Sequence, residues 1–352
     1  MNIALCGGGT AGSVTPLLAL WDELHIDQPR HSFLFVGTRS GFPEREMVSE
    51  CHIPFTTLIS GKFRRYLSLQ TAVAPFLVAV GFIQAVVIFM RFQPDVIIAA
   101  GGYVSVPCVW AGWLLGKKIV FHQPDVKPGL SLAMSHYCCT KITTGFQATV
   151  DRIPGAKAIW TGNPTRVYAR QGSKDLPSFP ENLPLLLITG GGTGSLFMNK
   201  VLGGSLPHIL ERMNVTAITG KNKSPGFTAN KRLRQFEFLK PRQLYQALAT
   251  ATIVVSRAGA SILSELSDLR KASILVPLPH SPQEDNAALF SASHAAVVIS
   301  QEEFSSSRLS REIDRLLQSP DDRAGLERAI ARFSKPGSGK MIASIIRSLG
   351  SV

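Results

Sequence analysis

Two stretches of this chain place a run of glycines directly after a short apolar segment, and they lie about half the chain length apart. The first reads NIALCGGGTAGSVTP, residues 2–16, and the second reads LLLITGGGTGSLFMN, residues 185–199. Glycine permits a tight turn and the close approach of a ligand, and a following helix offers unpaired N–H groups and a positive dipole end that suit a phosphate. We therefore predict two strand–loop–helix corners, in two α/β domains that each carry a ligand surface.

Apolar runs alternate with helical stretches in both halves of the chain. The runs are NIALC, SFLFVGT, DVIIAAG and KKIVFHQ in the first half, and LPLLLITG, NVTAITG, ATIVVSRAG, ASILVPLP and AAVVIS in the second. This alternation is typical of parallel strands joined by crossover helices, and 352 residues exceed one typical core. The expected fold class is α/β, with two Rossmann-like, doubly wound parallel-sheet domains that face each other across a cleft.

The best candidate for a linker is QGSKDLPSFPENLP, residues 171–184, because it combines three prolines with two serines and charged residues. We predict an N-terminal domain over residues 1–165, a linker over 166–184 and a C-terminal domain over 185–335. Residues 336–352 are expected to form a closing helix that can pack back on the N-terminal domain.

The charge balance predicts an anionic partner. The chain has 37 Lys and Arg against 24 Asp and Glu, a formal charge of +13, which suits nucleic acid, acidic lipid headgroups or a nucleotide. Because the basic residues form no run of five or more, we expect no nucleic-acid partner. Five cysteines without a C-x-x-C pair indicate reduced thiols in a cytoplasmic protein, and the first residues do not resemble a secretory signal.

One segment is apolar enough to span a membrane. Residues 66–90 contain no charge, although Pro75, Gly81 and Gln84 interrupt the run. Three interpretations stay open: one or two buried core helices, a helix pair lying shallowly in a bilayer, and a true span. Basic and aromatic residues suited to acidic headgroups flank the segment or follow in VWAGWLLGKK, namely Lys62, Arg64, Arg65, Arg91, Trp110, Trp113, Lys117 and Lys118. We expect contact with an anionic membrane surface, with the insertion depth of Ala72–Met90 left open.

The first glycine loop matches the dinucleotide fingerprint, with Gly7, Gly9 and Gly12 at the required spacing. That fingerprint also needs an acid at the end of the second strand to hold a ribose. Here the second strand ends FVGTRSG, without an Asp or Glu in place. The sequence therefore argues against a dehydrogenase and leaves an oxyanion or diphosphate as the ligand of this loop.

The second half contains a further strand–turn–helix corner. SRAGASILSELS, residues 256–267, predicts a helix that begins at Ala260 or Ser261, with Glu265 one turn inside it. A nucleotide there would have its phosphates at residues 259–261 and its ribose near Glu265; the alternative is a helix-surface or capping-box carboxylate. The later segment PLPHSPQEDNA groups amides and carboxylates that suit sugar hydroxyls, although a solvated loop would have a similar composition.

The motifs in order resemble the MurG family of bacterial peptidoglycan glycosyltransferases, which have two facing Rossmann-like domains of the GT-B type. The motifs are GGGTAGSVTP, AAGGYVSVP, HQPDVKPGL, TGNPTR, ITGGGTGS, SRAGASILSEL and PLPHSPQEDNA. The resemblance implies inverting transfer of N-acetylglucosamine from UDP-N-acetylglucosamine to the 4-hydroxyl of undecaprenyl-diphospho-muramoyl-pentapeptide (lipid I to lipid II), without a cofactor. It also implies a peripheral enzyme at the cytoplasmic face of the inner membrane that serves wall synthesis, cell shape and division.

The resemblance also assigns site residues in each half of the chain. The acceptor side, in the N-terminal domain, comprises Gly8, Gly9, Thr10, Gly12, Gly101, Gly102, Tyr103 and Ser105. The UDP-N-acetylglucosamine side comprises Thr10, Gly12, Asp125, Asn163, Arg166, Gly191, Gly192, Thr193, Gly194, Leu239, Ala260, Ser261, Glu265, Gln283 and Asn286. Within this set, the Leu239 backbone is expected to hold uracil and Glu265 the ribose. The side chains of Gln283 and Asn286 are expected to contact the sugar.

Several residues depart from the family pattern. Ser13 stands where the family has a histidine, and the donor loop has Gly192 and Thr193 in place of serine and glutamine. Losing the histidine removes a proton acceptor, and general-base assistance contributes roughly 10²–10⁴-fold to rate. We expect Asp125 and Ser13 to be the catalytic residues, with Asp125 as base; the alternative is that Asp125 caps a helix beginning near Pro128.

Absence of an Asp-x-Asp motif predicts a site that uses no metal, with leaving-group charge met by loop N–H groups and a helix N-terminus.

Two other functions remain open. One is a catalytically weakened homologue that binds a lipid-linked sugar or a nucleotide, and the other is a transferase acting on a different glycolipid acceptor. A transfer assay with several lipid acceptors separates the three.

Overall fold

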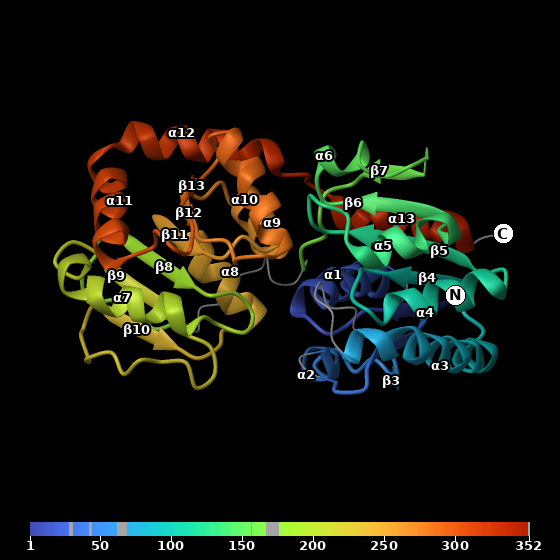
Figure 1. Ribbon diagram of the computed structural model, residues 1–352. Coiled ribbons are helices and arrows are strands. Elements are labelled where there is room, and N and C mark those ends of the chain that lie inside the picture. Colours follow the sequence, from blue (N-terminus) through green and yellow to red (C-terminus); the bar gives the residue numbers. More distant parts are fainter. Residues whose placement is uncertain (28–30, 42–43, 62–68, 156, 167–175, 351–352) are drawn as a thin grey trace. The chain divides into compact units, whose positions relative to one another are not determined.

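The computed structural model describes residues 1–27, 31–41, 44–61, 69–155, 157–166 and 176–350 (Figure 1). The chain divides into two compact units. Unit 1 comprises Met1–Arg166 and Lys335–Val352, and unit 2 comprises Val167–Ser334. Each unit contains one parallel β-sheet covered by helices, as the sequence predicted for an α/β fold.

Unit 1 is built on a seven-stranded sheet with the order β3-β2-β1-β4-β5-β6-β7. The strands are β1 Asn2–Cys6, β2 Ser32–Thr38, β3 Phe55–Leu58, β4 Val96–Ala99, β5 Lys118–Gln123, β6 Lys141–Thr144 and β7 Ala158–Trp160. Adjacent strands β1 and β4 are the point where the strand order reverses, and their register pairs Cys6 with Ala99. In such sheets ligands bind beyond the carboxyl ends at this switch point. Both predicted acceptor-side loops leave the sheet there.

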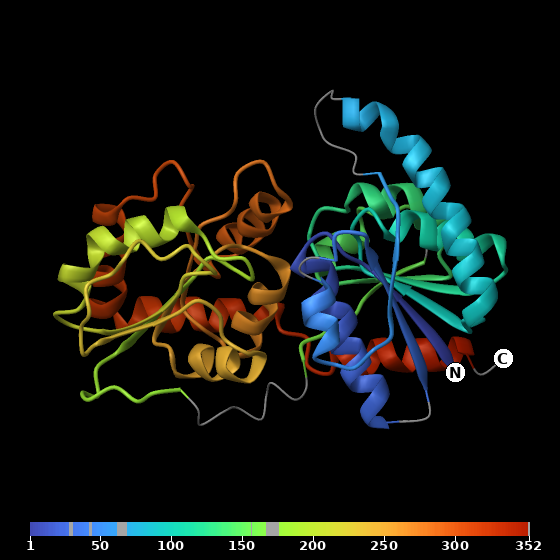
Figure 2. The same cartoon turned by 90° about the horizontal axis from the view of Figure 1, so that it is seen from below.

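Helices cover both faces of the unit 1 sheet. They are α1 Ala11–Asp27, α2 Glu44–Ser49, α3 Leu69–Phe92, α4 Ser105–Leu114, α5 Leu130–Ser135, α6 Gln147–Val150 and α13 Ser338–Gly350, with the 3₁₀ turn η1 His136–Cys138. α13 lies beside α1, and its Ile342, Ala343 and Ile346 join the same hydrophobic cluster (Figure 2). α3 and α4 pack together over the opposite face, with Phe89 and Val109 in the second cluster. The last helix of the chain therefore completes the core of the first unit.

Unit 2 repeats the plan with a six-stranded parallel sheet of order β10-β9-β8-β11-β12-β13. Its strands are β8 Leu185–Thr189, β9 Asn214–Ile218, β10 Leu233–Phe236, β11 Ile253–Ser256, β12 Ser273–Leu275 and β13 Val297–Val298. Its helices are α7 Leu196–Ile209, α8 Pro241–Thr250, α9 Ala260–Asp268, α10 Pro282–Ala292, α11 Ser306–Gln318 and α12 Pro320–Ile330, with the 3₁₀ turn η3 Ala331–Phe333. The order reverses between β8 and β11, so the second glycine loop and the Arg257–Gly259 turn leave the sheet side by side.

Candidate functional site

The two glycine loops of unit 1 meet at the carboxyl edge of the sheet. A Cβ atom on Gly102, which has φ +78°, would lie 2.3 Å from the carbonyl oxygen of Gly8. A Cβ atom on Gly9, with φ +85°, would lie 2.7 Å from the ring of Tyr103. Only glycine tolerates this approach together with a positive φ. The structure thus brings together the acceptor-side residues predicted from two separate motifs.

Ser13 is buried beneath the first loop and its hydroxyl contacts the loop backbone. The Oγ atom accepts the N–H of Gly8 at 3.2 Å and lies within donor distance of the carbonyl oxygens of Gly8, at 3.3 Å, and Thr10, at 3.0 Å. The residue is 5% exposed. These contacts occupy the hydroxyl and give Ser13 a clear task in holding the loop.

Glu44 is a site residue that the sequence analysis missed. It opens α2 and is fully buried, with Oε2 accepting the N–H of Gly9 at 3.3 Å and Oε1 accepting the N–H of Thr38 at 2.9 Å and the hydroxyl of the same threonine. An acid does follow the second strand, but it faces the glycine loop instead of a ribose. The available signal was a Glu shortly after a proline at a helix start, where a carboxylate is favoured.

The loop that carries Asp125 is fixed from inside the protein. The amide nitrogen of buried Gln123 donates to the carbonyl oxygens of Asp125 and Lys127, both at 3.2 Å, and its amide oxygen accepts the N–H of Gly129 at 3.3 Å. α5 begins at Leu130, and its N-cap Gly129 makes no side-chain cap hydrogen bond. Asp125 is therefore not the N-cap residue of this helix. Asp125 is partly exposed at the carboxyl edge of the sheet.

Asn163 and Arg166, predicted as donor contacts, bind groups of unit 1. The Asn163 amide oxygen lies 2.9 Å from Nε2 of buried His122, and its amide nitrogen donates to the Pro124 carbonyl oxygen at 3.2 Å. Burial lowers the pKa of His122 to about 4, so the imidazole is neutral at physiological pH. Arg166 forms an ion pair with buried Asp22 at 3.0 Å. Both predicted residues thus support the architecture of unit 1.

In unit 2 the second glycine loop, which we term the donor loop (residues 190–194), presents N–H groups outward. Gly194 donates to the carbonyl oxygen of Gly191 at 2.9 Å and closes the turn. Ser195 caps α7 by accepting the N–H of Met198 at 3.3 Å. Gly192 and Thr193 are exposed, and no acceptor among the described residues takes their N–H groups. A loop of this form at a helix N-terminus suits a phosphate.

Buried Arg257 ties the donor loop to the neighbouring strand. Its guanidinium donates to the carbonyl oxygens of Val276 and Pro277, both at 3.1 Å, to Ser195 Oγ at 3.2 Å and to Gln301 Oε1 at 2.7 Å. All these acceptors belong to unit 2, so this guanidinium aligns the start of α7. The sequence analysis did not single it out, although it lies in the SRAGA motif.

Glu265 lies one turn inside α9, as predicted, and the helix begins at Ala260. The N-cap Gly259 has no side chain and makes no cap hydrogen bond, so the capping-box alternative is wrong. Among the described residues, nothing donates a hydrogen bond to the Glu265 carboxylate. Burial, with a further contribution from Asp268, raises its pKa to about 7. A desolvated carboxylate of this kind is suited to accept ligand hydroxyls.

The remaining predicted donor residues differ in accessibility. Asn286 is fully buried and donates to the Ala258 carbonyl oxygen at 3.0 Å, so it supports the turn before α9. Gln283 is partly exposed and accepts the N–H of Leu278 at 3.0 Å through its amide oxygen. Leu239, whose backbone is the predicted contact for uracil, is buried.

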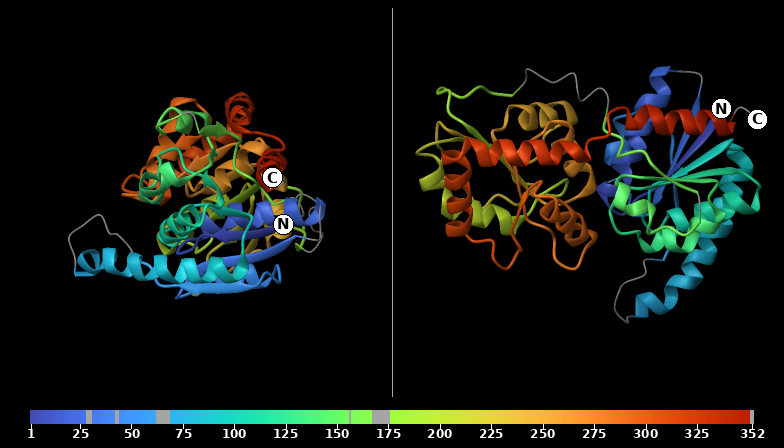
Figure 3. Two further views of the ribbon diagram at one scale, coloured as in Figure 1. Left: turned by 90° about the vertical axis from the view of Figure 1, so that its right-hand side faces the viewer. Right: turned by 90° about the horizontal axis from the view of Figure 1, so that it is seen from above.

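Helix α3 exposes much of its apolar surface. It is one helix, and its segment Val73–Phe92 is long and apolar enough to cross a membrane. Only 28% of this apolar stretch is buried inside the protein. The interpretation as a well-buried core helix is therefore wrong. Exposed apolar side chains lie on α3 and on nearby segments of unit 1, and they include Val73, Phe76, Ile83, Val87, Met90, Trp113, Leu114, Leu130 and Tyr137. One end of α3 extends beyond the rest of unit 1 (Figure 3). Lys62, Arg64 and Arg65 lie outside the described residues.

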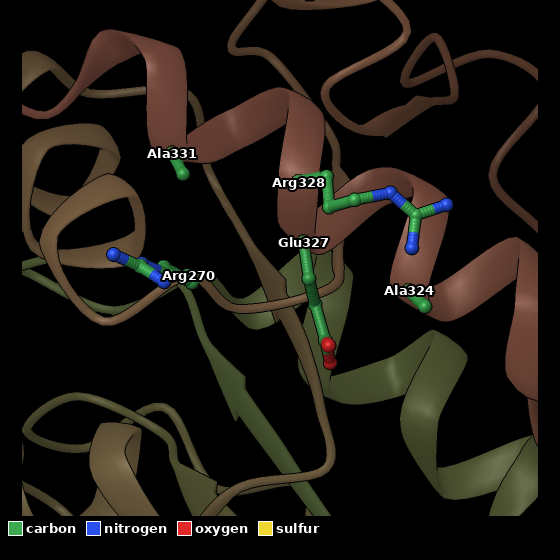
Figure 4. Close-up of a pocket in the computed structure, with 5 residues that line it drawn as sticks. All are labelled: Arg270, Ala324, Glu327, Arg328 and Ala331. Carbon is green, nitrogen blue, oxygen red and sulfur yellow. The ribbon is translucent and has the colours of Figure 1, made fainter.

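A surface groove of ≈ 470 Å³ beside α12 contains none of the predicted site residues. Arg270, Ala324, Glu327, Arg328 and Ala331 line it. The two arginine side chains and the glutamate extend in different directions (Figure 4). Because these charged groups do not converge, the groove does not form a site for a charged ligand. Among the described residues, no three His, Cys, Asp or Glu side chains are grouped to hold a metal ion.

Comparison with known families covers both units. The Glycosyltransferase family 28 N-terminal domain matches residues 3–144, and the Glycosyltransferase family 28 C-terminal domain matches residues 185–338. Because the matched ranges follow the two sheets, the similarity spans the parts that carry the glycine loops.

Similar proteins and structures agree with this assignment. A Clostridium kluyveri protein is 35% identical over 86% of this chain and 87% of its own length, and a Lachnoclostridium phytofermentans protein is 37% identical over 79% and 78%. Both are named UDP-N-acetylglucosamine–N-acetylmuramyl-(pentapeptide) pyrophosphoryl-undecaprenol N-acetylglucosamine transferase. The crystal structure of Acinetobacter baumannii MurG has a TM-score of 0.74 at 21% identity, covering 99% of both chains, and a calicheamicin glycosyltransferase has 0.74 at 12%, covering 100% and 98%. These structures confirm the predicted two-domain GT-B fold.

Proposed function

The chain belongs to glycosyltransferase family 28, and from this membership we propose that it transfers N-acetylglucosamine from UDP-N-acetylglucosamine to the muramoyl-pentapeptide carried on undecaprenyl diphosphate. The observation that carries the proposal is the shared name of relatives about one-third identical over most of both chains. The fold alone would not decide it, because a calicheamicin glycosyltransferase has the same architecture at 12% identity.

On the donor side, unit 2 binds UDP. The outward N–H groups of Gly192 and Thr193 and the N-termini of α7 and α9 meet the diphosphate, since backbone donors and helix dipoles favour anions. Glu265 accepts the ribose hydroxyls, which satisfies a carboxylate that has no donor among the described protein groups. The Leu239 backbone meets uracil, and the exposed part of Gln283 meets the sugar.

On the acceptor side, unit 1 holds the lipid diphosphate at the meeting point of its two glycine loops. The 4-hydroxyl oxygen of the muramoyl sugar attacks the anomeric carbon of N-acetylglucosamine as the bond to the UDP oxygen breaks. This single displacement inverts the anomeric configuration. Asp125 accepts the hydroxyl proton as the new bond forms, and UDP departs with the bonding electron pair. Ser13 keeps the loop in shape.

The exposed apolar face of α3 supports peripheral binding to an anionic membrane surface, on the cytoplasmic side where a lipid-linked acceptor is used. Apolar side chains enter the headgroup–acyl boundary while the chain's excess of basic residues attracts acidic lipids. Sedimentation with anionic vesicles tests this. We expect F76E/I83E to lose vesicle binding and to retain UDP binding, whereas unchanged sedimentation would exclude α3 as the contact.

The transfer reaction is tested with purified protein in detergent and radiolabelled UDP-N-acetylglucosamine. We expect a labelled disaccharide on the muramoyl-pentapeptide lipid and none on unrelated glycolipid acceptors. UDP binding without transfer would indicate a catalytically weakened homologue. Preferential labelling of another glycolipid would identify a different acceptor class.

A further inference from the structure

Lys223 lies on the turn after β9 and holds its ammonium group against the donor loop. Its Nζ atom donates to the carbonyl oxygens of Thr193, at 2.8 Å, and Gly194, at 3.1 Å. Its own backbone is also fixed, because the amide nitrogen of buried Asn199 donates to the carbonyl oxygens of Lys223 at 2.8 Å and Thr219 at 2.9 Å. The side chain therefore starts from an anchored position and ends on the loop.

The turn that carries Lys223 also touches the donor loop through backbone atoms. A Cβ atom on Gly194, which has φ +70°, would lie 2.2 Å from the Thr219 carbonyl oxygen. A Cβ atom on Gly220, with φ +85°, would lie 2.5 Å from the Thr193 carbonyl oxygen. Such close approach between two turns needs glycine on both sides. Turn and loop thus form one rigid support.

The direction of the two carbonyl groups has a consequence for ligand binding. In a trans peptide the C=O and N–H bonds point in opposite directions. When the carbonyl oxygens of Thr193 and Gly194 face the ammonium, the N–H groups of the same two peptides, which belong to Gly194 and Ser195, face away from it. The ammonium also polarises these peptides and adds a positive charge behind the turn that exposes Gly192 and Thr193.

We propose that Lys223 is a positioning residue for the donor diphosphate, orienting the peptide dipoles of the donor loop and placing a fixed cation behind them. The inference rests on the proposed function, in which UDP leaves from this loop. Negative charge grows on the β-phosphate as the sugar bond breaks, so a fixed cation stabilises the transition state more than the bound substrate. Lys223 therefore affects both UDP affinity and turnover.

Calorimetry with UDP and uridine separates this role from general damage. We expect K223M to bind UDP about tenfold more weakly, because charge-assisted contacts near the diphosphate are lost, and to bind uridine within about twofold of the unchanged protein. K223R keeps the charge and should recover most of the UDP affinity. K200M is the matched control, because it removes the same charge from Lys200, which is exposed on α7.

The outcomes are distinct. Unchanged UDP affinity in K223M would overturn the inference, and so would an equal loss for UDP and uridine, which would indicate a damaged unit. An equal loss of UDP affinity in K200M would also overturn it, because net charge alone would then explain the effect. If the unchanged protein binds no UDP, the proposed function fails and this inference fails with it.

Discussion

The glycine loops of the two units share a backbone plan and differ in the charged group held against them. In unit 1 the Glu44 carboxylate accepts a hydrogen bond from the N–H of Gly9. In unit 2 the Lys223 ammonium donates hydrogen bonds to the carbonyl oxygens of Thr193 and Gly194. A carboxylate removes a donor from the loop and adds negative charge. An ammonium leaves the N–H donors free and adds positive charge. Similar sequences therefore produce two loops with different charged groups held against them.

This difference matches the chemistry proposed for each unit. The donor diphosphate is a leaving group that gains negative charge, and a fixed cation lowers the energy of that change. The lipid diphosphate of the acceptor keeps its charge throughout, so its loop needs only to bind and orient it. The contrast predicts that variants in unit 1 and unit 2 will affect different substrates.

The largest effect is expected from D125N, which tests whether proton transfer belongs to unit 1. Asparagine keeps the size of the side chain and cannot accept the hydroxyl proton, so we expect turnover to fall about 10²–10⁴-fold. UDP affinity, measured by calorimetry, should be unchanged. D151N is the control, since Asp151 is exposed in the same unit. Wild-type turnover in D125N would remove Asp125 from the mechanism.

Glu265 supplies the next largest effect and makes the unit 2 site sensitive to pH. Its pKa is raised to about 7, and ribose hydroxyls prefer the ionised form. UDP affinity should therefore be highest above pH 7 and fall by up to about tenfold per pH unit below it, until the lowered pKa of the complex is reached. E265Q should bind UDP about 10–100-fold more weakly and without this pH dependence.

The control for this pH experiment is E303Q, which changes an exposed glutamate elsewhere in unit 2. Its affinity profile should overlay that of the unchanged protein. A profile in E265Q that still falls below pH 7 would assign the titration to another group. The KM for the lipid acceptor should not follow the same profile, because Glu265 belongs to the donor unit.

E44Q tests the carboxylate that is held against the unit 1 glycine loop. Glutamine has one acceptor oxygen, so it cannot hold both Gly9 and Thr38 as the carboxylate does. Loss of one buried contact should raise the KM for the lipid acceptor about 3–10-fold and leave the KM for UDP-N-acetylglucosamine unchanged. E46Q, an exposed change on the same helix, is the control. A larger shift in the donor KM would break the contrast between the loops.

Sequence patterns predicted the parts of this molecule that depend on near neighbours in the chain. Alternating apolar runs indicated the two parallel sheets, and the glycine runs indicated both corners at the switch points. Glu265 was located one turn inside α9 for the same reason. Each of these features depends on residues within a few positions of one another.

The contacts of Glu44 and Lys223 with the glycine loops could not be predicted in this way. Glu44 lies 35 residues from Gly9, and Lys223 lies 30 residues from Thr193. The direction of Asn286, which is turned into the protein, depends equally on a partner 28 residues away. Residue type and local periodicity do not state which turn will face which loop, so such contacts need the folded chain.

The smallest expected effect compares the two serines that support the loops. Ser13 contacts the Gly8 and Thr10 backbone in unit 1, and Ser195 caps α7 in unit 2. Each change to alanine should lower the free energy of unfolding by about 1 kcal/mol, measured by denaturant titration. S13A should keep turnover within about twofold, because its hydroxyl is committed to the backbone. If S13A instead lost turnover without losing stability, Ser13 would take part in proton transfer, and the unit 1 loop would contribute to the chemistry as well as to binding.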